Sequence, residues 1–123
     1  MIELAQLARI IDIEFHDLLA GSSQIDQGKI RAHLLDGSFV DIWYSRKIPG
    51  RFSYHWERRH VDGTIFRHDN FPDPRWKDVS SFPKHFHEFS QTSVRESSID
   101  DNPVDGLRQF MNFVRDLLSK SNV

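Results

Sequence analysis

The feature that most constrains the fold is an alternation of apolar and polar residues in the middle of the chain. In the segment RFSYHWERR, residues 51–59, apolar side chains occupy every second position from Phe52 to Trp56. Successive side chains of a β-strand point to opposite faces of a sheet, so this alternation predicts a strand with one buried face. Pro49-Gly50 before it and Asp62-Gly63 after it favour tight turns, which join antiparallel strands.

Segments on either side extend this pattern into a sheet. Extended structure is also expected for residues 29–35, 39–46 and 64–69, and one edge strand for residues 85–96. Three prolines, Pro72, Pro74 and Pro83, predict an irregular loop over residues 70–84. Together these segments predict an antiparallel meander of four to five strands.

Two amphipathic segments flank the strands. In residues 2–20, apolar side chains recur at three- and four-residue steps, which predicts a helix ending before Gly21. Asn102 and Pro103 are favoured at the start of a helix, and the apolar stripe after them predicts a C-terminal helix. We therefore predict an α+β fold of one domain, residues 1–123, with both helices packed on one face of the sheet and the other face largely open.

The composition excludes several classes of protein. The chain has 123 residues and no cysteine, which excludes disulfides, thiolate zinc sites and cysteine nucleophiles. Its formal net charge of −2 gives no overall basic field for nucleic acid. No apolar run approaches the roughly 20 residues of a membrane-spanning helix. Charged residues near the start argue against a signal peptide, so we expect a cytoplasmic protein with no membrane partner.

The turn near Gly63 decides which side chains share a face. A two-residue turn at Asp62-Gly63 would mix charged with apolar side chains. A three-residue loop, residues 61–63 with Gly63 in the left-handed conformation, would separate them, because a slip of one residue reverses every side chain. We therefore predict the three-residue loop, which pairs Glu57 with Arg67 and His55 with Asp69.

Aromatic residues are abundant, with 10 phenylalanines and 3 tryptophans. Most of those in the strands are predicted to form the core beneath the helices, namely Phe39, Trp43, Phe52, Tyr54, Trp56 and Phe66. Trp76 lies in the predicted loop, where three roles stay open: it caps the edge of the sheet, stacks on a base, or docks a partner protein.

The predicted register collects His55, Glu57, Arg67 and Asp69 on the polar face. One interpretation is a set of cross-strand ion pairs on a solvated surface. The other is a surface for proton transfer and anion binding. A carboxylate can fix the tautomer of a neighbouring histidine, and an arginine can bind a phosphate through two hydrogen bonds.

His85 and His87 would lie on one face of a strand, since they are two residues apart. With His55 or Asp69 nearby, they could hold zinc or another divalent ion. They could equally be ordinary surface histidines beside a proline-rich loop.

A third interpretation of the histidines is metal-independent cleavage of RNA. One imidazole would remove the proton of a 2′-hydroxyl, and another would protonate the leaving oxygen. Arg67 or Lys84 would stabilise the negatively charged phosphorane.

Four short motifs occur in order along the middle of the chain. They are Asp36-Gly37-Ser38, Tyr54-His55-Trp56, Ile65-Phe66-Arg67-His68-Asp69-Asn70 and Phe82-Pro83-Lys84-His85-Phe86-His87. This order resembles the TumE family, regarded as the toxins of prokaryotic toxin–antitoxin pairs, in which Tyr-His, Phe-Arg-Tyr-Asp-Asn and Phe-Pro-His-His-Lys-His follow one another. The resemblance covers about residues 36–87, and the flanking helices match in character.

The matching polar positions are His55, Arg67, Asp69, Asn70, His85 and His87. We predict as catalytic residues His55, Arg67, Asp69, His85 and His87, and as binding residues Asn70, Lys84, Trp76 and Glu57, with no metal or cofactor assigned. The chain also departs from the family pattern. His68 replaces the usual aromatic residue, Phe71-Pro72-Asp73-Pro74 stands in place of Ala-Pro-His-His, and Lys84 replaces a histidine.

The resemblance implies a toxin with a cognate antitoxin and, by analogy with other small toxins, a metal-independent ribonuclease acting on RNA. One alternative is a non-enzymatic binding or assembly module, in which the same residues form a structural hydrogen-bond network. Another is an inactive relative that has lost family histidines. Catalysis requires convergence within about 10 Å in an open cleft, whereas full burial of His55 and Asp69 would favour the network. An exposed strand edge or the aromatic face would also permit a homodimer.

Overall fold

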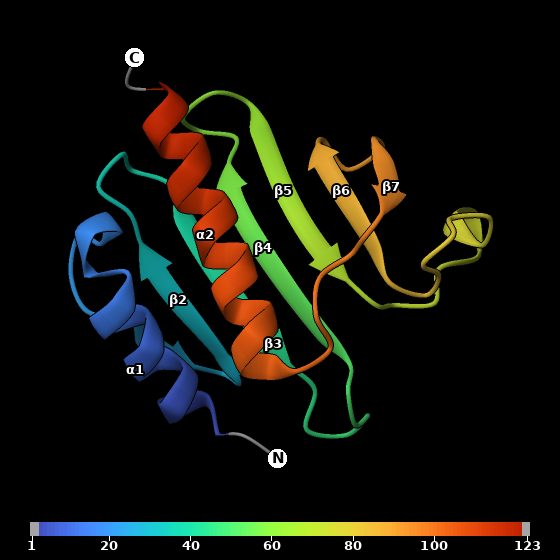
Figure 1. Cartoon of the computed structure of the whole chain (residues 1–123), viewed down its shortest axis with the longest axis horizontal. Helices are drawn as coiled ribbons and strands as arrows, with labels where there is room; N and C mark the ends of the chain where they lie inside the picture. The colour runs from blue at the N-terminus through green and yellow to red at the C-terminus, as the bar shows by residue number, and fades with distance from the viewer. Residues whose placement is uncertain (1–2, 122–123) are drawn as a thin grey trace.

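The computed structural model describes residues 3–121. Within this range the chain forms two α-helices and one antiparallel sheet of seven strands (Figure 1). The helices are α1 (Leu4–Glu14) and α2 (Pro103–Ser121), and the strands are β1 (Gln24–Asp26), β2 (Lys29–His33), β3 (Phe39–Tyr44), β4 (Phe52–Arg58), β5 (Thr64–Asp69), β6 (His85–Phe89) and β7 (Val94–Glu96). The predicted α+β class and antiparallel meander are confirmed.

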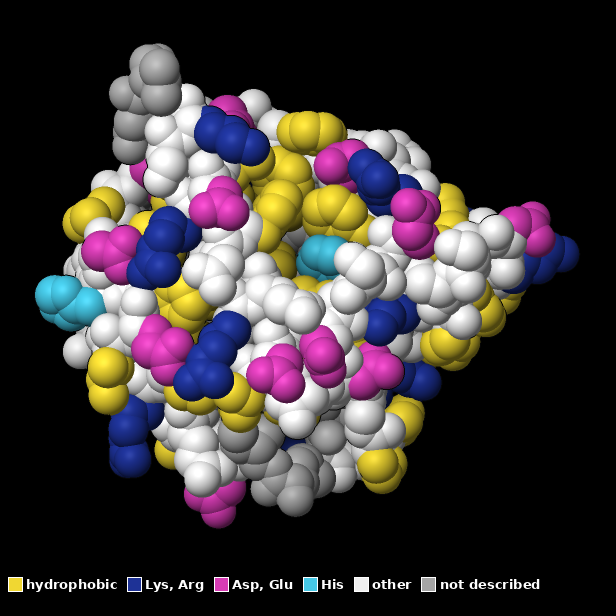
Figure 2. Space-filling model, viewed as in Figure 1, with side chains coloured by type: hydrophobic (Ala, Val, Ile, Leu, Met, Phe, Trp, Pro, Cys, Tyr) yellow, Lys and Arg dark blue, Asp and Glu magenta, His cyan; other side chains and the backbone are white. Residues whose placement is uncertain are grey.

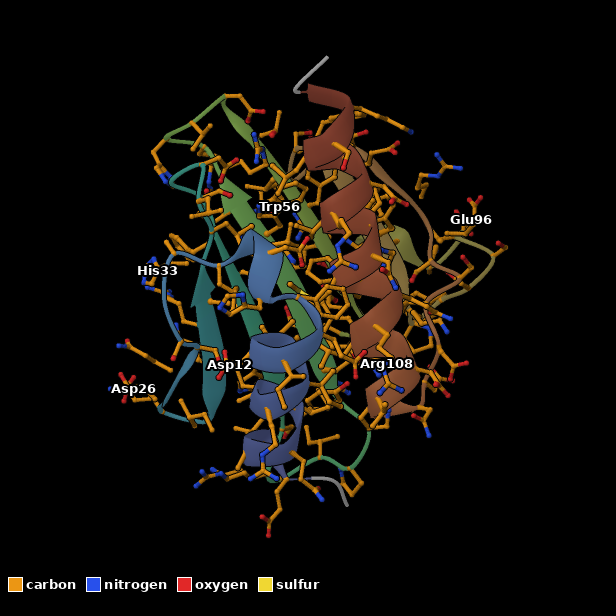
Figure 3. All side chains as sticks on the ribbon, turned by 60° about the vertical axis from the view of Figure 1, so that its left-hand side comes forward. Asp12, Asp26, His33, Trp56, Glu96 and Arg108 are labelled. Atoms are coloured by element: carbon orange, nitrogen blue, oxygen red, sulfur yellow. The ribbon has the colours of Figure 1, made fainter. Side chains whose placement is uncertain are left out.

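The strands stand in the sheet in chain order, each antiparallel to the next. Both helices lie on the same face of the sheet, α2 across β3 and β4 and α1 beside β2 (Figure 1). Figure 3 shows Trp56 between the strands and α2, where it is fully buried with its indole N–H donating to Ser38 Oγ at 2.9 Å. As predicted, both helices cover one face. No helix among the described residues is long and apolar enough to cross a membrane.

The predicted strand count of four to five was too low. The short strand β1 pairs with β2, but all three of its residues are exposed, so no alternation marks it in the sequence. Residues 85–96 form the two strands β6 and β7 rather than one, because the chain reverses between Phe89 and Val94. The loop over residues 70–84 contains no strand, as predicted, and includes one 3-10 turn, Pro74–Trp76.

The first helix is shorter than the predicted span of residues 2–20. It ends at Glu14, and a separate 3-10 turn, His16–Leu18, follows it. Phe15 between them has a non-helical backbone (φ −119°, ψ 24°), yet its side chain is buried, so the change of direction still brings the apolar residues into the core. The second helix begins as predicted, because the side-chain oxygen of Asn102 accepts hydrogen bonds from two backbone N–H groups of the first turn, at 3.0 and 3.1 Å.

The register between β4 and β5 differs from the predicted one. His55 lies opposite Arg67 and Trp56 opposite Phe66, so the loop spans residues 59–63 instead of residues 61–63. The Arg58 carbonyl accepts hydrogen bonds from three backbone N–H groups of this loop, which closes the longer turn. Gly63 has the predicted left-handed conformation, with φ +82°. Because the register differs by two residues, every side chain keeps its predicted face.

Two of the predicted core aromatics lie on the opposite face. In β3 the buried residues are Val40 and Ile42, so Phe39 and Trp43 point away from the helices. Trp43 stacks on Phe71, with ring centroids 5.6 Å apart. The prediction was wrong because aromatic character was taken as the sign of burial, whereas alternation along β3 decides the face. The other four predicted core aromatics, Phe52, Tyr54, Trp56 and Phe66, are buried.

The helices leave part of their own face uncovered. Between α2 and the β5–β7 side of the sheet, Figure 2 shows a hollow in which a histidine is surrounded by apolar side chains. Its lining includes His68, Phe86, Phe110 and Phe113. The His68 ring stacks on Phe86 with a centroid distance of 4.2 Å and an interplanar angle of 10°.

Candidate functional site

Three buried polar side chains converge where β5 ends and β6 begins. Asp69, the last residue of β5, lies opposite His85, the first residue of β6, and His87 follows on the same face. His85 Nε2 lies 3.2 Å from Asp69 Oδ1, and His87 Nε2 lies 3.6 Å from Asp69 Oδ2. The exposed fractions of Asp69, His85 and His87 are 4%, 2% and 4%. Strand pairing therefore brings one carboxylate to two imidazoles.

A second contact fixes the orientation of each imidazole. His85 Nδ1 lies 2.9 Å from the carbonyl oxygen of Pro83, and His87 Nδ1 lies 2.8 Å from the carbonyl oxygen of Gln91. A carbonyl oxygen can only accept, so Nδ1 of each histidine carries the proton. In a neutral imidazole Nε2 then presents a lone pair, and both Nε2 atoms face the Asp69 carboxylate. Such lone pairs would repel the carboxylate. A positive charge between the carboxylate and the two Nε2 atoms, either a proton or a cation, would therefore stabilise the cluster.

Arg67 connects this cluster to β4. The register places Arg67 between His55 of β4 and His87 of β6. Its Nε donates to Asp69 Oδ2 at 3.0 Å and its Nη2 donates to Gln91 Oε1 at 2.6 Å. The remaining nitrogen, Nη1, lies 3.4 Å from His55 Nδ1. The guanidinium therefore lies between the buried cluster and His55.

His55 is oriented by a carboxylate of its own. His55 Nε2 lies 3.2 Å from Glu57 Oε1, and Arg59 donates to the same carboxylate, which lowers the pKa of Glu57 to about 2. Because an ionised carboxylate only accepts, Nε2 of His55 carries the proton, and the Nδ1 lone pair accepts the long contact from Arg67 Nη1. Burial lowers the pKa of His55 despite the opposing hydrogen bond to Glu57, so the ring is neutral at pH 7. Its side chain is 16% exposed, which leaves it in reach of the open face.

Asp69 is ionised despite its burial. Burial alone would raise the pKa of Asp69, but the contacts with His87, the Phe71 N–H and Arg67 more than offset it and hold the pKa below its ordinary value. The cluster thus contains a permanent negative charge, one adjacent guanidinium and two imidazoles, a composition suited to moving a proton or holding a cation.

A hollow of about 270 Å³ lies against this cluster on the face that the helices leave open. Asp73, Arg75 and Trp76, from the 3-10 turn and the residue before it, form part of its wall. The Trp76 ring lies 6.1 Å from the His87 ring and 6.4 Å from the His85 ring, centroid to centroid. Of the roles left open for Trp76, its position agrees with a cap over this edge of the sheet. The residues that line the hollow are Ser53, Arg67, Asp69, Phe71, Asp73, Arg75, Trp76, His85 and His87.

Two predicted binding residues lie outside the cluster. Asn70 bonds the neighbouring turn, accepting from the Phe52 N–H at 2.9 Å and donating to the Gly50 carbonyl at 2.8 Å. Lys84 extends to the segment before α2, where its Nζ lies 2.5 Å from the Ile99 carbonyl oxygen and 3.2 Å from Asp101 Oδ1. Both residues hold loops in place, so Arg67 is the cation that the structure places at the cluster.

Sequence reasoning missed the residues that support the cluster from loops. Gln91 contributes its side chain to Arg67 and its carbonyl to His87, and the Pro83 carbonyl orients His85. Backbone carbonyls carry no mark in a sequence, and Gln91 lies in a turn between strands that was not predicted. Their contribution depends on where the β6–β7 hairpin reverses.

Burial of His55 and Asp69 was expected to distinguish a structural network from a catalytic site, and the two residues differ in burial. Asp69, His85 and His87 are enclosed, which agrees with a structural network, whereas His55 is partly exposed and a hollow adjoins the cluster. The five predicted catalytic residues are nonetheless in one connected chain of contacts from His55 through Arg67 and Asp69 to the two histidines. Such an arrangement can bind an anion at its edge and exchange a proton or hold a cation at its centre.

The chain is thus a small α+β protein whose meander sheet bears a histidine–aspartate–arginine cluster on its uncovered face. The chain belongs to the TumE family: the family model described as Toxin TumE matches residues 4–118. The match covers α1, most of α2 and the motifs between residues 36 and 87, and it confirms the resemblance read from them. A search of curated proteins and a search of solved structures found no match. Membership of a toxin family implies a cognate antitoxin.

Proposed function

We propose that this chain is the toxin of a toxin–antitoxin pair and that it acts by cleaving RNA. The observation that carries the proposal is the contact chain joining His55, Arg67, Asp69, His85 and His87 beside an open hollow. Family membership supports the toxin assignment, and the chemistry of the cluster supports cleavage of a phosphodiester.

The residues divide into roles along the contact chain. His55 is neutral, and a 2′-hydroxyl that displaces the long 3.4 Å contact of Arg67 Nη1 gives its proton to the Nδ1 lone pair. The 2′-oxygen attacks phosphorus, the bond from phosphorus to the 5′-oxygen breaks, and Arg67 stabilises the charge that develops on the phosphorane. The Asp69–His85–His87 cluster supplies the positive charge that the leaving oxygen needs. In the metal-independent form expected from the sequence, this charge is a proton on an imidazole Nε2, which passes to the 5′-oxygen.

A non-enzymatic module is the second candidate, and one specific observation favours it. Asp69, His85 and His87 are nearly inaccessible to solvent. Among the described residues, every buried polar atom of a side chain has a hydrogen-bond partner. In that case the cluster fixes the 70–84 loop to the sheet, and toxicity would depend on binding rather than cleavage.

Induced expression in a bacterial host, with and without the product of the neighbouring gene, tests the proposal. We expect growth arrest with loss of cellular RNA, relieved by the partner, and fragments ending in a 2′,3′-cyclic phosphate. Arg67→Ala and His85→Ala should abolish arrest while circular dichroism shows that the variants are folded. His33→Ala, at an exposed position on β2 away from the cluster, should remain toxic. Harmless expression with intact RNA would overturn the proposal, and arrest without RNA loss would favour the binding module.

A further inference from the structure

We propose that Asp69, His85 and His87 form a binding site for one divalent transition-metal ion. Their potential ligand atoms, one carboxylate oxygen and two imidazole nitrogens, all lie within 4.8 Å of one another. Two imidazoles and a carboxylate favour zinc and its first-row neighbours, whereas magnesium and calcium prefer sites made of oxygen atoms. The site itself is inferred from geometry and does not depend on the proposed function.

The distances fit a metal centre that is nearly formed. Bonds of about 2.0–2.2 Å to a tetrahedral ion place neighbouring ligand atoms roughly 3.3–3.6 Å apart. His85 Nε2 lies 3.2 Å from Asp69 Oδ1, and His87 Nε2 lies 3.6 Å from the other carboxylate oxygen, Oδ2. Since the ligand atoms span at most 4.8 Å, small side-chain rotations suffice to bring all three onto one ion.

The surroundings of the imidazoles match those of metal ligands. A histidine that binds a metal commonly donates its other ring N–H to a carbonyl or carboxylate, which fixes the tautomer and aims the lone pair. Both histidines have this contact, to the Pro83 and Gln91 carbonyls, and both Nε2 atoms face Asp69. With both imidazoles neutral at Nε2, a divalent cation would make attractive bonds to the two nitrogens and to the carboxylate.

Charge and access also favour a cation at this position. Arg67 Nε donates to Asp69 Oδ2 and the Phe71 N–H donates to Oδ1, both at 3.0 Å, so two donors orient the carboxylate. The guanidinium opposes the cation electrostatically, so the affinity should be lower than that of a site without it. Three protein ligands leave a coordination position open, and the adjoining hollow gives it access to water or a phosphate oxygen. If the proposed function holds, the ion takes the place of the proton as the positive charge beside the leaving oxygen.

Metal titration of the purified, chelator-treated chain tests the site. We expect one Zn²⁺ per chain by calorimetry, and Co²⁺ should give visible absorption bands of a low-coordinate nitrogen–oxygen site. His87→Gln should weaken Zn²⁺ binding by more than about 10-fold. Loss of a residue that only orients a ligand can already cost about 10-fold, so loss of a ligand itself should cost more. His33→Gln is the matched control, because it removes an exposed histidine elsewhere on the sheet and should leave the binding unchanged.

The outcomes separate this site from the proposed function. Stoichiometric binding that His87→Gln removes and His33→Gln does not would support the site, even if the chain degrades no RNA. Equal binding by the wild type and His87→Gln, or no binding at all, would overturn it. If the chain binds no metal and still cleaves RNA in the presence of a chelator, the positive charge beside the leaving oxygen is a proton on an imidazole.

Discussion

At the scale of single residues, neighbours in one motif have different tasks. Asp69 and Asn70 are adjacent and both belong to the motif shared with the family, yet their side chains diverge. Asp69 meets the two histidines and Arg67, whereas Asn70 bonds the Phe52 N–H and the Gly50 carbonyl. Asn70 therefore maintains the β3–β4 turn, and a role in binding stays a prediction for it.

His68 gives a pH-dependent prediction at the residue scale. Burial against Phe86, together with the nearby positive charge of Lys84, lowers its pKa to about 4. The unfolded chain takes up this proton near pH 6.5, so the native state loses stability as the pH falls from 6.5 toward 4. Between pH 7 and pH 5 the loss attributable to His68 should be about 2 kcal/mol.

The measurement is urea unfolding of the wild type and of His68→Phe at pH 7 and pH 5. Phenylalanine keeps the stacking on Phe86 and removes the titrating group, so its stability should fall less over this interval. The comparison is between pH slopes, since the variant also loses the 2.7 Å contact with Ser97 Oγ. Equal slopes for the two proteins would contradict the prediction.

At the scale of elements, α2 is fixed to the sheet by close packing near its first turn. Gly106 has no side chain, and Asn102 caps the helix just before it. A Cβ added to Gly106 would lie 2.6 Å from the Asp100 carbonyl oxygen and 2.8 Å from the Tyr54 hydroxyl. The helix can approach β4 this closely only because the position is glycine.

Gly106→Ala should therefore destabilise the protein. At an open helical site this change would add about 1 kcal/mol of stability. Here the clash with backbone should reverse the sign, with a loss of about 1–3 kcal/mol. Chemical unfolding measures the change, and Asp116→Ala, at an exposed position of the same helix, is the control that should change stability little. A stabilised Gly106→Ala variant would show that the first turn can move away from Tyr54.

At the scale of the whole molecule, the sheet separates two functions between its faces. One face packs against α1 and α2 and contains most of the core (Figures 1 and 3). The other bears His55, Arg67 and the buried cluster, with aromatic side chains such as Trp43 nearby. The site is built on β4, β5 and β6, so regular strand pairing positions its side chains, while its outer wall comes from the 70–84 loop.

Amide hydrogen exchange should reveal this gradient of stability. The strands β3 and β4 are central and lie under α2, so their amides should exchange only through global unfolding. The edge strands β1 and β7 are three residues long and mostly exposed, so their amides should exchange through local opening. Mass spectrometry or NMR can compare the strands directly. Protection of β7 equal to that of β4 would contradict this account.

Local patterns predicted what depends on periodicity and turn chemistry. The alternation in residues 51–59 predicted the faces of β4, and the Asn102 cap predicted the start of α2. The patterns did not predict strand β1 or the length of the loop before Gly63, because each depends on only a few residues. The three exposed residues of β1 show no alternation, and the loop before Gly63 closes through bonds to one carbonyl, that of Arg58. Such backbone contacts depend on the fold around them.

The sequence by itself determined that the sheet has an apolar and a polar face and that two helices flank it. It also determined which residue types are available for chemistry in a chain without cysteine. The resemblance to the family picked out His55, Arg67, Asp69, His85 and His87 as candidates, and strand parity, which depends only on counting residues, assigned their faces. Only the tertiary structure decided which of them touch. Pairing of β5 with β6 places Asp69 between two imidazoles, and backbone carbonyls from two loops turn both lone pairs toward it. Distances between segments far apart in the chain are set by register and packing, which no local pattern encodes.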